Sequence, residues 1–434
     1  MNLKLTSISS LQLFQLMRFG TFILIGIIFT KTQLSTEAIG EYEQFLFLAG
    51  GVSFFWLNGL IRSLLSIANE SREDHASPIF NAFLLISALS VLVIIALALG
   101  SRLLGEQLLG EATGPYLPLL LAYLFFSVPA NLVEYFFLLK KQPGRILRYG
   151  VISFLLMLIL VSLPPVIGFD IQWSLYGLLG VAVGRYGYLL VLLLRAGENR
   201  YSASFMQKHW QVALPLIFSA LLSGSAQYVD GFIVTSYFDE ATFAVFRYGA
   251  RELPLVVLLA NAFSNALLPE FSDKGRLVEN LSRIKSESLR LSNVLFPLSA
   301  VMLLCSHALF PVVFNAGFAA SATIFNVYLL LIISRLLFPQ TILIGLQKTR
   351  MIAWASAGEL LLNVCLSLWF VQLWGIVGVA YATVVAYLFE KLFLAVVVRQ
   401  SLNIGITKYQ NCFRHLIYSL LLLALFIIVE FVMY

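Results

Sequence analysis

Long apolar runs separated by short polar segments dominate the chain, and FLLISALSVLVIIALALG at 83–100 is one example. At about 1.5 Å per residue, a run of about 18 residues or more crosses a hydrocarbon core as a helix. A transmembrane barrel would instead show short alternating segments. The pattern predicts thirteen helical spans, at 11–31, 42–66, 79–100, 115–139, 149–167, 174–195, 211–236, 242–268, 291–314, 322–346, 352–373, 375–398 and 413–433.

Composition supports an all-α, polytopic integral membrane protein. Hydrophobic residues make up 60% of the chain and charged residues 12%, with a mean hydropathy of +0.90, far outside the range of ordinary soluble domains. The three cysteines and four histidines fall into no metal or disulfide pattern, and no phosphate-binding GxxxxGK[ST] loop occurs. We therefore expect no cofactor, apart from a coupling ion, and no nucleotide-driven pump.

Basic residues indicate the orientation, because they collect in alternate loops between the predicted spans. These are Lys140, Lys141, Arg145, Arg148, Arg195, Arg200, Lys208, Lys274, Arg276, Arg283, Lys285 and Arg290. By the positive-inside rule these loops and the N-terminus are cytoplasmic, and an odd number of spans places Tyr434 outside. Most of the net charge of +6 reflects this bias, and the basic residues form no continuous patch for nucleic acid.

The cytoplasmic stretch at 275–292 places apolar residues near helical spacing between charges. Such a segment is typical of a helix that lies along the membrane surface. An ordinary solvated extension of the ninth span explains the pattern equally well, so the sequence leaves both interpretations open.

Several short segments of the chain occur twice. GLLGVA at 177–182 returns as GIVGVA at 375–380, TEAIGEY at 36–42 resembles TFAVFRY at 242–248, and QPGRI at 142–146 resembles QKTRM at 347–351. The offsets of 198, 206 and 205 residues indicate a duplicated six-helix unit. The glycines of the hexapeptides favour close helix packing over direct contact with a substrate.

The repeat predicts three parts: an N-terminal six-helix bundle at 1–200, a C-terminal six-helix bundle at 201–400, and an extra transmembrane helix within 401–434. Because six is even, both bundles enter the membrane with the same orientation, and a cavity is expected between them. Prolines inside predicted spans, Pro129, Pro215, Pro254, Pro297 and Pro339, predict kinks that would allow hinge motion. The expected mechanism is alternating access.

Ionisable residues inside the spans are the candidate functional residues, because a charge within a bilayer is costly and marks a cavity or pathway. The basic ones are Arg18, Arg62, Arg185, Arg247, Arg251, Arg335 and Lys391, which we expect to bind substrate in a central cationic cavity. The acidic ones are Asp230, Glu134, Glu252, Glu359, Glu390 and Glu430. All of these except Glu430 are candidates for coupling to H⁺ or Na⁺, although a structural ion pair explains them as well.

Predicted depth divides these residues. Arg18, Arg62, Glu134, Glu359, Glu390 and Lys391 lie near cytoplasmic ends of spans, where snorkelling is a competing explanation for the basic side chains. Arg185 and Arg335 lie near the middle of their spans and cannot reach the membrane surface. The remaining arginines, Arg247 and Arg251, are expected on one helix face. They lie at about the same depth in the membrane as Asp230, which is therefore a candidate salt-bridge partner for one of them. An excess of arginine suits an anionic, phosphate-bearing cargo.

Four segments of the sequence resemble the multidrug/oligosaccharidyl-lipid/polysaccharide (MOP) flippase superfamily, in its polysaccharide-exporter branch. They are RFGTFILIGIIFTKTQLSTEAIGEY at 18–42, YVDGFIVTSYFDEATFAVFRYGARELP at 228–254, ALLPEFS at 266–272 and GIVGVAYATVVAY at 375–387. The resemblance implies a V-shaped pair of six-helix bundles around a cationic cavity. It also implies that the protein moves an undecaprenyl-diphosphate-linked oligosaccharide across a bacterial inner membrane, as in O-antigen, lipopolysaccharide or capsule assembly, beside other glycan-assembly membrane proteins.

Two other functions compete with this one. A cation-coupled multidrug antiporter of the same superfamily is disfavoured because acidic residues would be expected to dominate its cavity. A membrane polysaccharide polymerase or ligase is disfavoured because such enzymes commonly carry a large periplasmic loop, whereas the outer loops here are about fifteen residues or fewer. We therefore expect a transporter rather than an enzyme.

Overall fold

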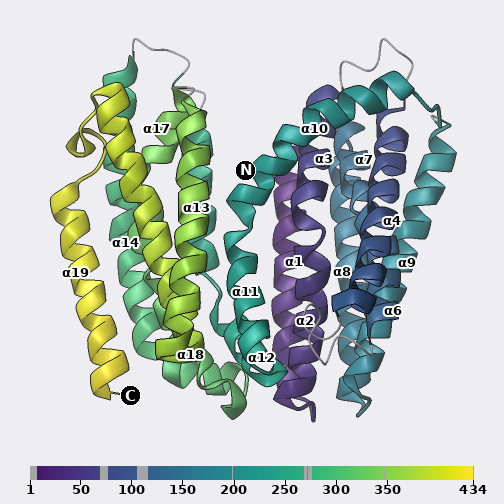
Figure 1. The fold of residues 1–434 in the computed structure, drawn as a ribbon, viewed down its shortest axis with the longest axis horizontal. Helices are drawn as coiled ribbons and strands as arrows, with labels where there is room; N and C mark the ends of the chain where they lie inside the picture. Colours follow the sequence, from purple (N-terminus) through teal and green to yellow (C-terminus); the bar gives the residue numbers. More distant parts are fainter. Residues whose placement is uncertain are drawn as a thin grey trace. The chain divides into compact units, whose positions relative to one another are not determined.

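The computed structural model describes residues 7–68, 77–104, 116–197, 199–267, 271, 276–346 and 348–433 (Figure 1). Within these ranges every regular element is a helix, which confirms the all-α prediction. Contacts divide the chain into two compact units. Lys274 and part of the 266–272 segment lie outside the described residues.

The first unit comprises residues 1–224 and 239–244. Its helices are α1 (Ser7–Thr30), α2 (Thr36–Gly51), α3 (Phe54–Ile67), α4 (Pro78–Leu104), α6 (Leu117–Ala130), α7 (Leu132–Leu139), α8 (Pro143–Val166), α9 (Ile171–Ala196), α10 (Ala203–Gly224) and the first part of α12 (Glu240–Gly249). Reciprocal hydrogen bonds join α3 and α10: the Ser63 hydroxyl donates to the His209 carbonyl, and His209 Nε2 lies 2.9 Å from the Leu60 carbonyl.

The second unit comprises residues 225–238 and 245–434. Its helices are α11 (Ala226–Tyr237), the rest of α12, α13 (Pro254–Leu267), α14 (Leu277–Val313), η4 (Ala316–Phe318), α15 (Ser321–Leu329), α16 (Ile332–Arg335), α17 (Pro339–Gly345), α18 (Thr349–Leu402), η5 (Ile406–Lys408), α19 (Cys412–Ile428) and η6 (Val429–Met433). The contacts thus group α10 with the first unit, whereas the repeat predicts a division after residue 200, and a symmetric pair of six-helix bundles stays a prediction.

Multiple membrane crossings are evident in the described residues. Eight helices there are long and apolar enough to cross a membrane, or ten if each of two bent helix pairs counts as one span. Those pairs are α2 with α3, bent by 47°, and α15–α16 with α17, bent by 46°. Helix α18 is one of the eight, yet it covers two of the spans predicted from the sequence.

Two of the five span prolines begin a helix directly after a break, and a third, Pro129, lies in the last turn of α6, just before the break to α7. Pro254 is the first residue of α13 and follows a non-helical stretch at 250–253, and Pro339 is the first residue of α17. A proline disfavours helical geometry at the residue before it, which explains both breaks. Pro215 and Pro297 instead lie inside the unbroken helices α10 and α14.

The repeated hexapeptides have a packing role at one glycine of each copy. A Cβ added at Gly177 would lie 2.2 Å from the Leu160 carbonyl oxygen, and one added at Gly378 would lie 2.1 Å from that of Phe370. Nothing lies within 4 Å of a Cβ added at Gly180. Gly375 has φ 58° and ψ −141° and bends α18, because this backbone conformation is open to glycine but not to other residues.

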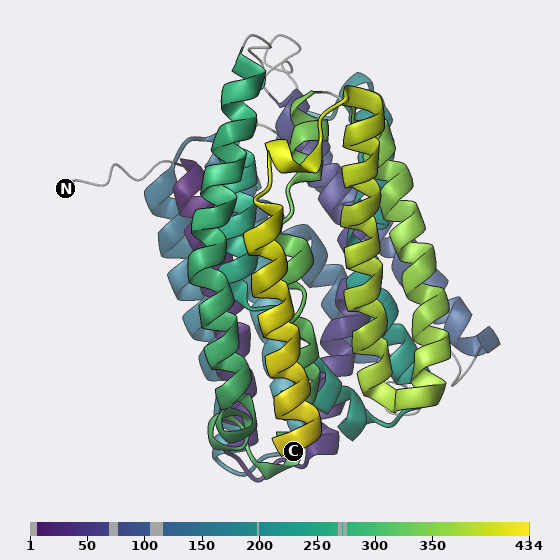
Figure 2. The same cartoon turned by 90° about the vertical axis from the view of Figure 1, so that its left-hand side faces the viewer.

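The C-terminal helix α19 lies beside α14, as Figures 1 and 2 show. Its Tyr418 hydroxyl donates to Asn293 Oδ1 at 2.9 Å, and His415 Nε2 lies 3.1 Å from the Ile333 carbonyl. Residues 412–433 are long and apolar enough to cross a membrane, so the extra C-terminal helix is present. Helix α14 begins at Leu277 and is continuous, so the 277–291 part of the amphipathic stretch extends the ninth span.

Candidate functional site

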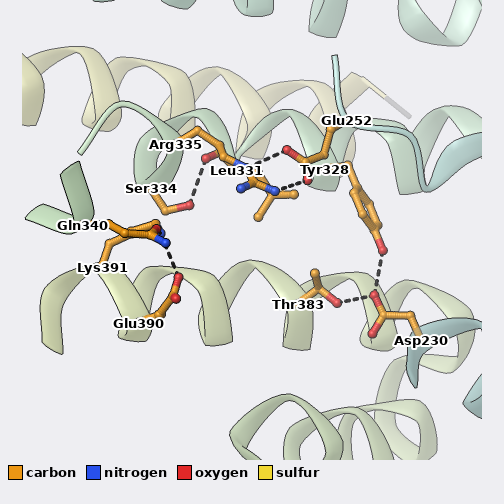
Figure 3. Close-up of polar contacts among 10 residues, drawn as sticks. All are labelled: Asp230, Glu252, Tyr328, Leu331, Ser334, Arg335, Gln340, Thr383, Glu390 and Lys391. Atoms are coloured by element: carbon orange, nitrogen blue, oxygen red, sulfur yellow. Dashed lines mark hydrogen bonds and ion pairs between the residues drawn. The ribbon is translucent and has the colours of Figure 1, made fainter. Parts of the chain in front are cut away.

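Asp230 of α11 lies in a buried site made of neutral polar groups within the second unit (Figure 3). Its Oδ2 accepts hydrogen bonds from the Tyr328 hydroxyl at 2.9 Å and the Thr383 hydroxyl at 2.5 Å, and its Oδ1 accepts one from Asn363 Nδ2 at 3.2 Å. Asn363 Oδ1 in turn accepts from the Ser367 hydroxyl at 2.9 Å. A carboxylate held by neutral donors has its lone pairs oriented but its charge uncompensated.

Asp230 forms no salt bridge with a basic residue of the described ranges, so the salt-bridge alternative for Asp230 with Arg247 or Arg251 is wrong. The two arginines also do not share a helix face, because α12 ends at Gly249 and Arg251 follows it. The guanidinium of Arg251 lies over the Tyr248 ring, 5.0 Å from its centroid. The non-helical stretch before Pro254 is the physical reason for this difference.

Arg335 of α16 is held by a bidentate ion pair with Glu252 (Figure 3). Its Nε donates to Glu252 Oε2 at 2.8 Å and its Nη2 donates to Oε1 at 2.5 Å. Its guanidinium also lies 4.6 Å from the centroid of the Tyr387 ring. Arg335 therefore has a carboxylate partner, and the structural ion pair that the sequence left open for Glu252 is present.

Glu390 and Lys391 form a second ion pair, at 2.8 Å, on the C-terminal half of α18 (Figure 3). Ser356 donates to Glu390 Oε1 at 3.2 Å, and Lys391 Nζ donates to Gln340 Oε1 at 3.0 Å. Both charged side chains are buried, so snorkelling does not explain Lys391. Glu359 is also buried, and its Oε1 has no hydrogen-bond partner in the part of the chain that the structure describes.

The first unit contains a third polar cluster, around Arg185 of α9. Arg185 Nε donates to the Tyr149 hydroxyl at 2.6 Å, and Arg185 Nη2 lies 3.6 Å from Glu134 Oε2, too far for a hydrogen bond. Arg185 Nη2 and Glu134 Oε2 are both buried, and neither has a hydrogen-bond partner among the described residues. Arg18 of α1 adds a second positive charge that acts on Glu134. Arg185 is therefore also paired with a carboxylate, as the sequence left open for Glu134.

Arg18 and Arg62 differ from these paired arginines. The Arg18 side chain is half-buried and that of Arg62 is exposed. Among the described residues neither one forms a hydrogen bond or salt bridge through its side chain. Both lie within electrostatic range of Tyr135 on α7.

Neutral residues of the clusters were missed by the sequence analysis, which considered only charges. A usable signal was present: Ser356, Glu359, Asn363 and Ser367 recur every three or four residues along an apolar helix. That spacing places polar groups on one helix face. It would have connected Glu359 with the residues around Asp230.

The sequence matches the model of the family "Lipid II flippase MurJ" over residues 5–434. The chain belongs to the MurJ family. The superfamily prediction is therefore confirmed, but the match does not support the O-antigen branch. No curated protein gives a significant match to the sequence.

Solved structures with similar folds include a MurJ and transporters of the multidrug MATE family. The structure described as "Lipid II flippase MurJ, inward closed conformation" gives a TM-score of 0.68 at 18% identity, covering 97% of this chain and 98% of that one. An inward-facing MATE transporter of the MOP superfamily gives 0.63 at 15% identity, covering 88% and 94%. An outward-facing MATE transporter of the MOP superfamily gives 0.57 at 18% identity, covering 92% and 94%. These likenesses show the transporter fold of this MurJ family member.

Proposed function

We propose that this protein is a flippase for a polyprenyl-diphosphate-linked saccharide of the lipid II type in a bacterial inner membrane. The family match over nearly the whole chain carries the proposal. The diphosphate carries concentrated negative charge, for which the planar donor fork of arginine is well suited. The proposed cycle is alternating access.

Arg18 and Arg62 are the arginines that we propose for direct contact with the diphosphate, together with Arg247 and Arg251 as further cavity candidates. Lys391 is buried and paired with Glu390, so we do not propose it for this contact. Arg185 and Arg335 are already engaged by Glu134 and Glu252. A guanidinium bound to an internal carboxylate has fewer donors left for a ligand. We therefore assign these two a mainly structural role.

Reconstitution into liposomes with fluorescent lipid II tests the proposal. A membrane-impermeant quencher of the fluorophore measures how fast lipid reaches the outer leaflet. Arg18→Ala and Arg62→Ala should each reduce the rate at least tenfold, whereas the charge-conserving Arg62→Lys should retain part of it. Wild-type rates in both alanine variants would contradict the assignment.

The identity of the saccharide is decided by competition in the same assay. An undecaprenyl-diphosphate-linked O-antigen repeat unit, the cargo that the sequence resemblance implies, is added in excess over lipid II. Inhibition by excess unlabelled lipid II but not by the O-antigen unit supports the lipid II assignment, and stronger inhibition by the O-antigen unit than by unlabelled lipid II supports the O-antigen assignment.

Cation coupling at Asp230 is the second part of the proposal. The Asp230 carboxylate and the hydroxyl oxygens of Tyr328 and Thr383 offer one anionic and two neutral oxygen-bearing groups, a set that suits H⁺ or Na⁺. Flipping rates under separately collapsed proton and sodium gradients identify the ion. Asp230→Asn should remove the dependence on that gradient, and an unchanged dependence would refute the assignment.

A cation-coupled multidrug antiporter is the alternative function, and the MATE fold likeness together with the Asp230 site favours it. Extrusion of a fluorescent cationic dye from the same liposomes tests it. Dye transport without lipid II flipping would replace the first proposal by this one.

A further inference from the structure

A stripe of polar residues runs along the first half of α18. Ser356, Glu359, Asn363 and Ser367 share one helix face. At about 1.5 Å per residue, Glu359 lies about 4.5 Å along the axis from Ser356 and about 6 Å from Asn363. Ser356 contacts Glu390, and Asn363 contacts Asp230. Glu359 therefore lies between the Glu390–Lys391 pair and the Asp230 site.

The second half of α18 contributes the polar residues that contact this stripe or the same Asp230 site. Thr383 donates to Asp230, and Glu390 and Lys391 follow about two turns later on the same helix, as Figure 3 shows. The two halves are joined at the break of Trp374 and Gly375. Polar groups thus recur along both halves of α18, from Glu390 and Lys391 to the residues that donate to Asp230 on α11.

The charges of this region do not balance. Its acidic residues are Asp230, Glu252, Glu359 and Glu390, and its basic residues are Arg335 and Lys391. Four negative and two positive charges leave a net charge of −2 when every group is ionised. Both basic residues are in ion pairs, with Glu252 and Glu390. The two carboxyl groups left over are those of Asp230 and Glu359.

These two carboxyl groups differ in their surroundings. Asp230 accepts three hydrogen bonds, which stabilise an ionised carboxylate. Glu359 is 5% exposed, and its Oε1 accepts no hydrogen bond in the described structure. An ionised carboxylate without a donor or counter-ion is the costliest group to bury, whereas a protonated carboxyl group is neutral. Burial and the absence of a donor thus favour a proton on Glu359.

We infer that Glu359 holds an exchangeable proton and is a proton-binding site on a polar path between the Glu390–Lys391 pair and Asp230. The charged groups that act on it electrostatically are Glu390 and Lys391 of α18, Asp230 of α11 and Arg335 of α16. A cation that arrives at Asp230 adds positive charge nearby and favours release of the Glu359 proton. This inference extends the proposed coupling at Asp230, but its test measures no transport and so can fail independently of that proposal.

Infrared spectroscopy of the purified full-length protein provides the test, since a protonated carboxyl group has its own carbonyl stretching band. The wild-type protein is titrated from acidic to alkaline pH and compared with Glu359→Gln, which keeps the size of the side chain but cannot titrate. The wild type should show one band at neutral pH that is absent in Glu359→Gln and that fades as the pH rises. The control Glu37→Gln removes an exposed acid and should leave that band unchanged.

The link to Asp230 is tested by replacing choline chloride with sodium chloride. With sodium bound, the midpoint at which the Glu359 band fades should move to lower pH by about one to two units, as expected when a positive charge is added near a carboxyl group in a partly polar interior. Asp230→Asn should abolish this shift. Identical spectra for wild type and a folded Glu359→Gln would overturn the proton site, and a band unaffected by sodium would overturn the link to Asp230.

A folding defect in Glu359→Gln is recognised by thermal unfolding, and Glu359→Leu supplies a second variant. If Glu359 is neutral, Leu at this position leaves the unfolding temperature unchanged or raises it, because no charge or hydrogen bond is lost. If Glu359 is ionised, its removal relieves repulsion from Asp230 and Glu390, so the unfolding temperature can also rise. In that case, however, the wild type shows no band of a protonated carboxyl group. The spectra therefore decide between the two states for either variant.

Discussion

Replacing Arg335 by glutamine is expected to destabilise the second unit, because Glu252 would keep its charge and lose its bidentate partner. Hydrogen bonds to charged groups contribute about 1.5–3 kcal/mol each, and breaking a fully buried ion pair costs about 3–5 kcal/mol. Here the two side chains are 22% and 23% exposed, so water partly screens the remaining charge. We expect Arg335→Gln to cost about 3 kcal/mol.

The double variant Glu252→Gln/Arg335→Gln should recover part of this loss, because two amides can hydrogen bond to each other without leaving a charge. The coupling energy between the two positions is expected to be about 1.5–2 kcal/mol. Arg290→Gln is the matched control, since Arg290 is 81% exposed and lies 3.9 Å from Glu287. Such an exposed pair contributes at most about 1 kcal/mol.

Reversible unfolding in mixed micelles, followed by tryptophan fluorescence, measures all four proteins of the cycle. Additive losses, with a coupling energy below about 0.5 kcal/mol, would refute the structural role of the Glu252–Arg335 pair. The flipping rate of the double variant then separates stability from substrate binding. A stable double variant that flips lipid II confirms that Arg335 acts through the fold.

Other predictions concern the helices that hold the site. Gly378→Ala should lower stability by about 1–3 kcal/mol through overpacking, and Gly180→Ala, with open space, should be neutral or stabilising by up to about 1 kcal/mol. Thermal unfolding of the two variants measures the contrast, and equal effects would contradict the close approach at Gly378. Gly375→Ala should cost about 1–3 kcal/mol through backbone strain, and a wild-type unfolding temperature would contradict the bend. Asp239→Ala should cost about 0.5–2 kcal/mol by removing the cap of α12. Hydrogen bonds from Thr242 lower the pKa of Asp239, so this cap is present above the carboxyl group's ordinary pKa and is lost as the pH falls through the lowered value. A loss that persists unchanged in acid would contradict that assignment.

Hydropathy predicted most of the fold, because span length and apolar composition are properties of single segments. The extra helix α19 and the bend at Trp374 both appear where the sequence placed them. The break before Pro254 had a local signal in the proline itself, but its effect on Arg251 depends on where α12 ends. The spacing of Arg247 and Arg251 suggested a shared helix face that the chain does not form.

Partners of the buried charges were harder to predict, because they come from distant parts of the chain. Arg335 and Glu252 are 83 residues apart, and Thr383 and Asp230 are 153 apart. The ionisable residues could be identified because charges are rare in membrane helices. Neutral donors such as Tyr328 and Asn363 are not rare there and do not stand out individually in the sequence. The regular spacing of polar residues on α18 pointed to Asn363, whereas Tyr328 lies on α15 and had no such signal.

These separations also set an order of events during synthesis. Ribosomes add about 5–20 residues per second, so the 153 residues between Asp230 and Thr383 take about 8–30 s to make. Asp230 therefore emerges before any of its donors on α15 or α18 exists. Glu390 and Lys391, by contrast, are neighbours in the sequence and emerge together. The translocon that inserts this chain therefore receives Glu390 together with its counter-ion Lys391. It receives Asp230 before most of the second unit, including the donors to Asp230, has been made.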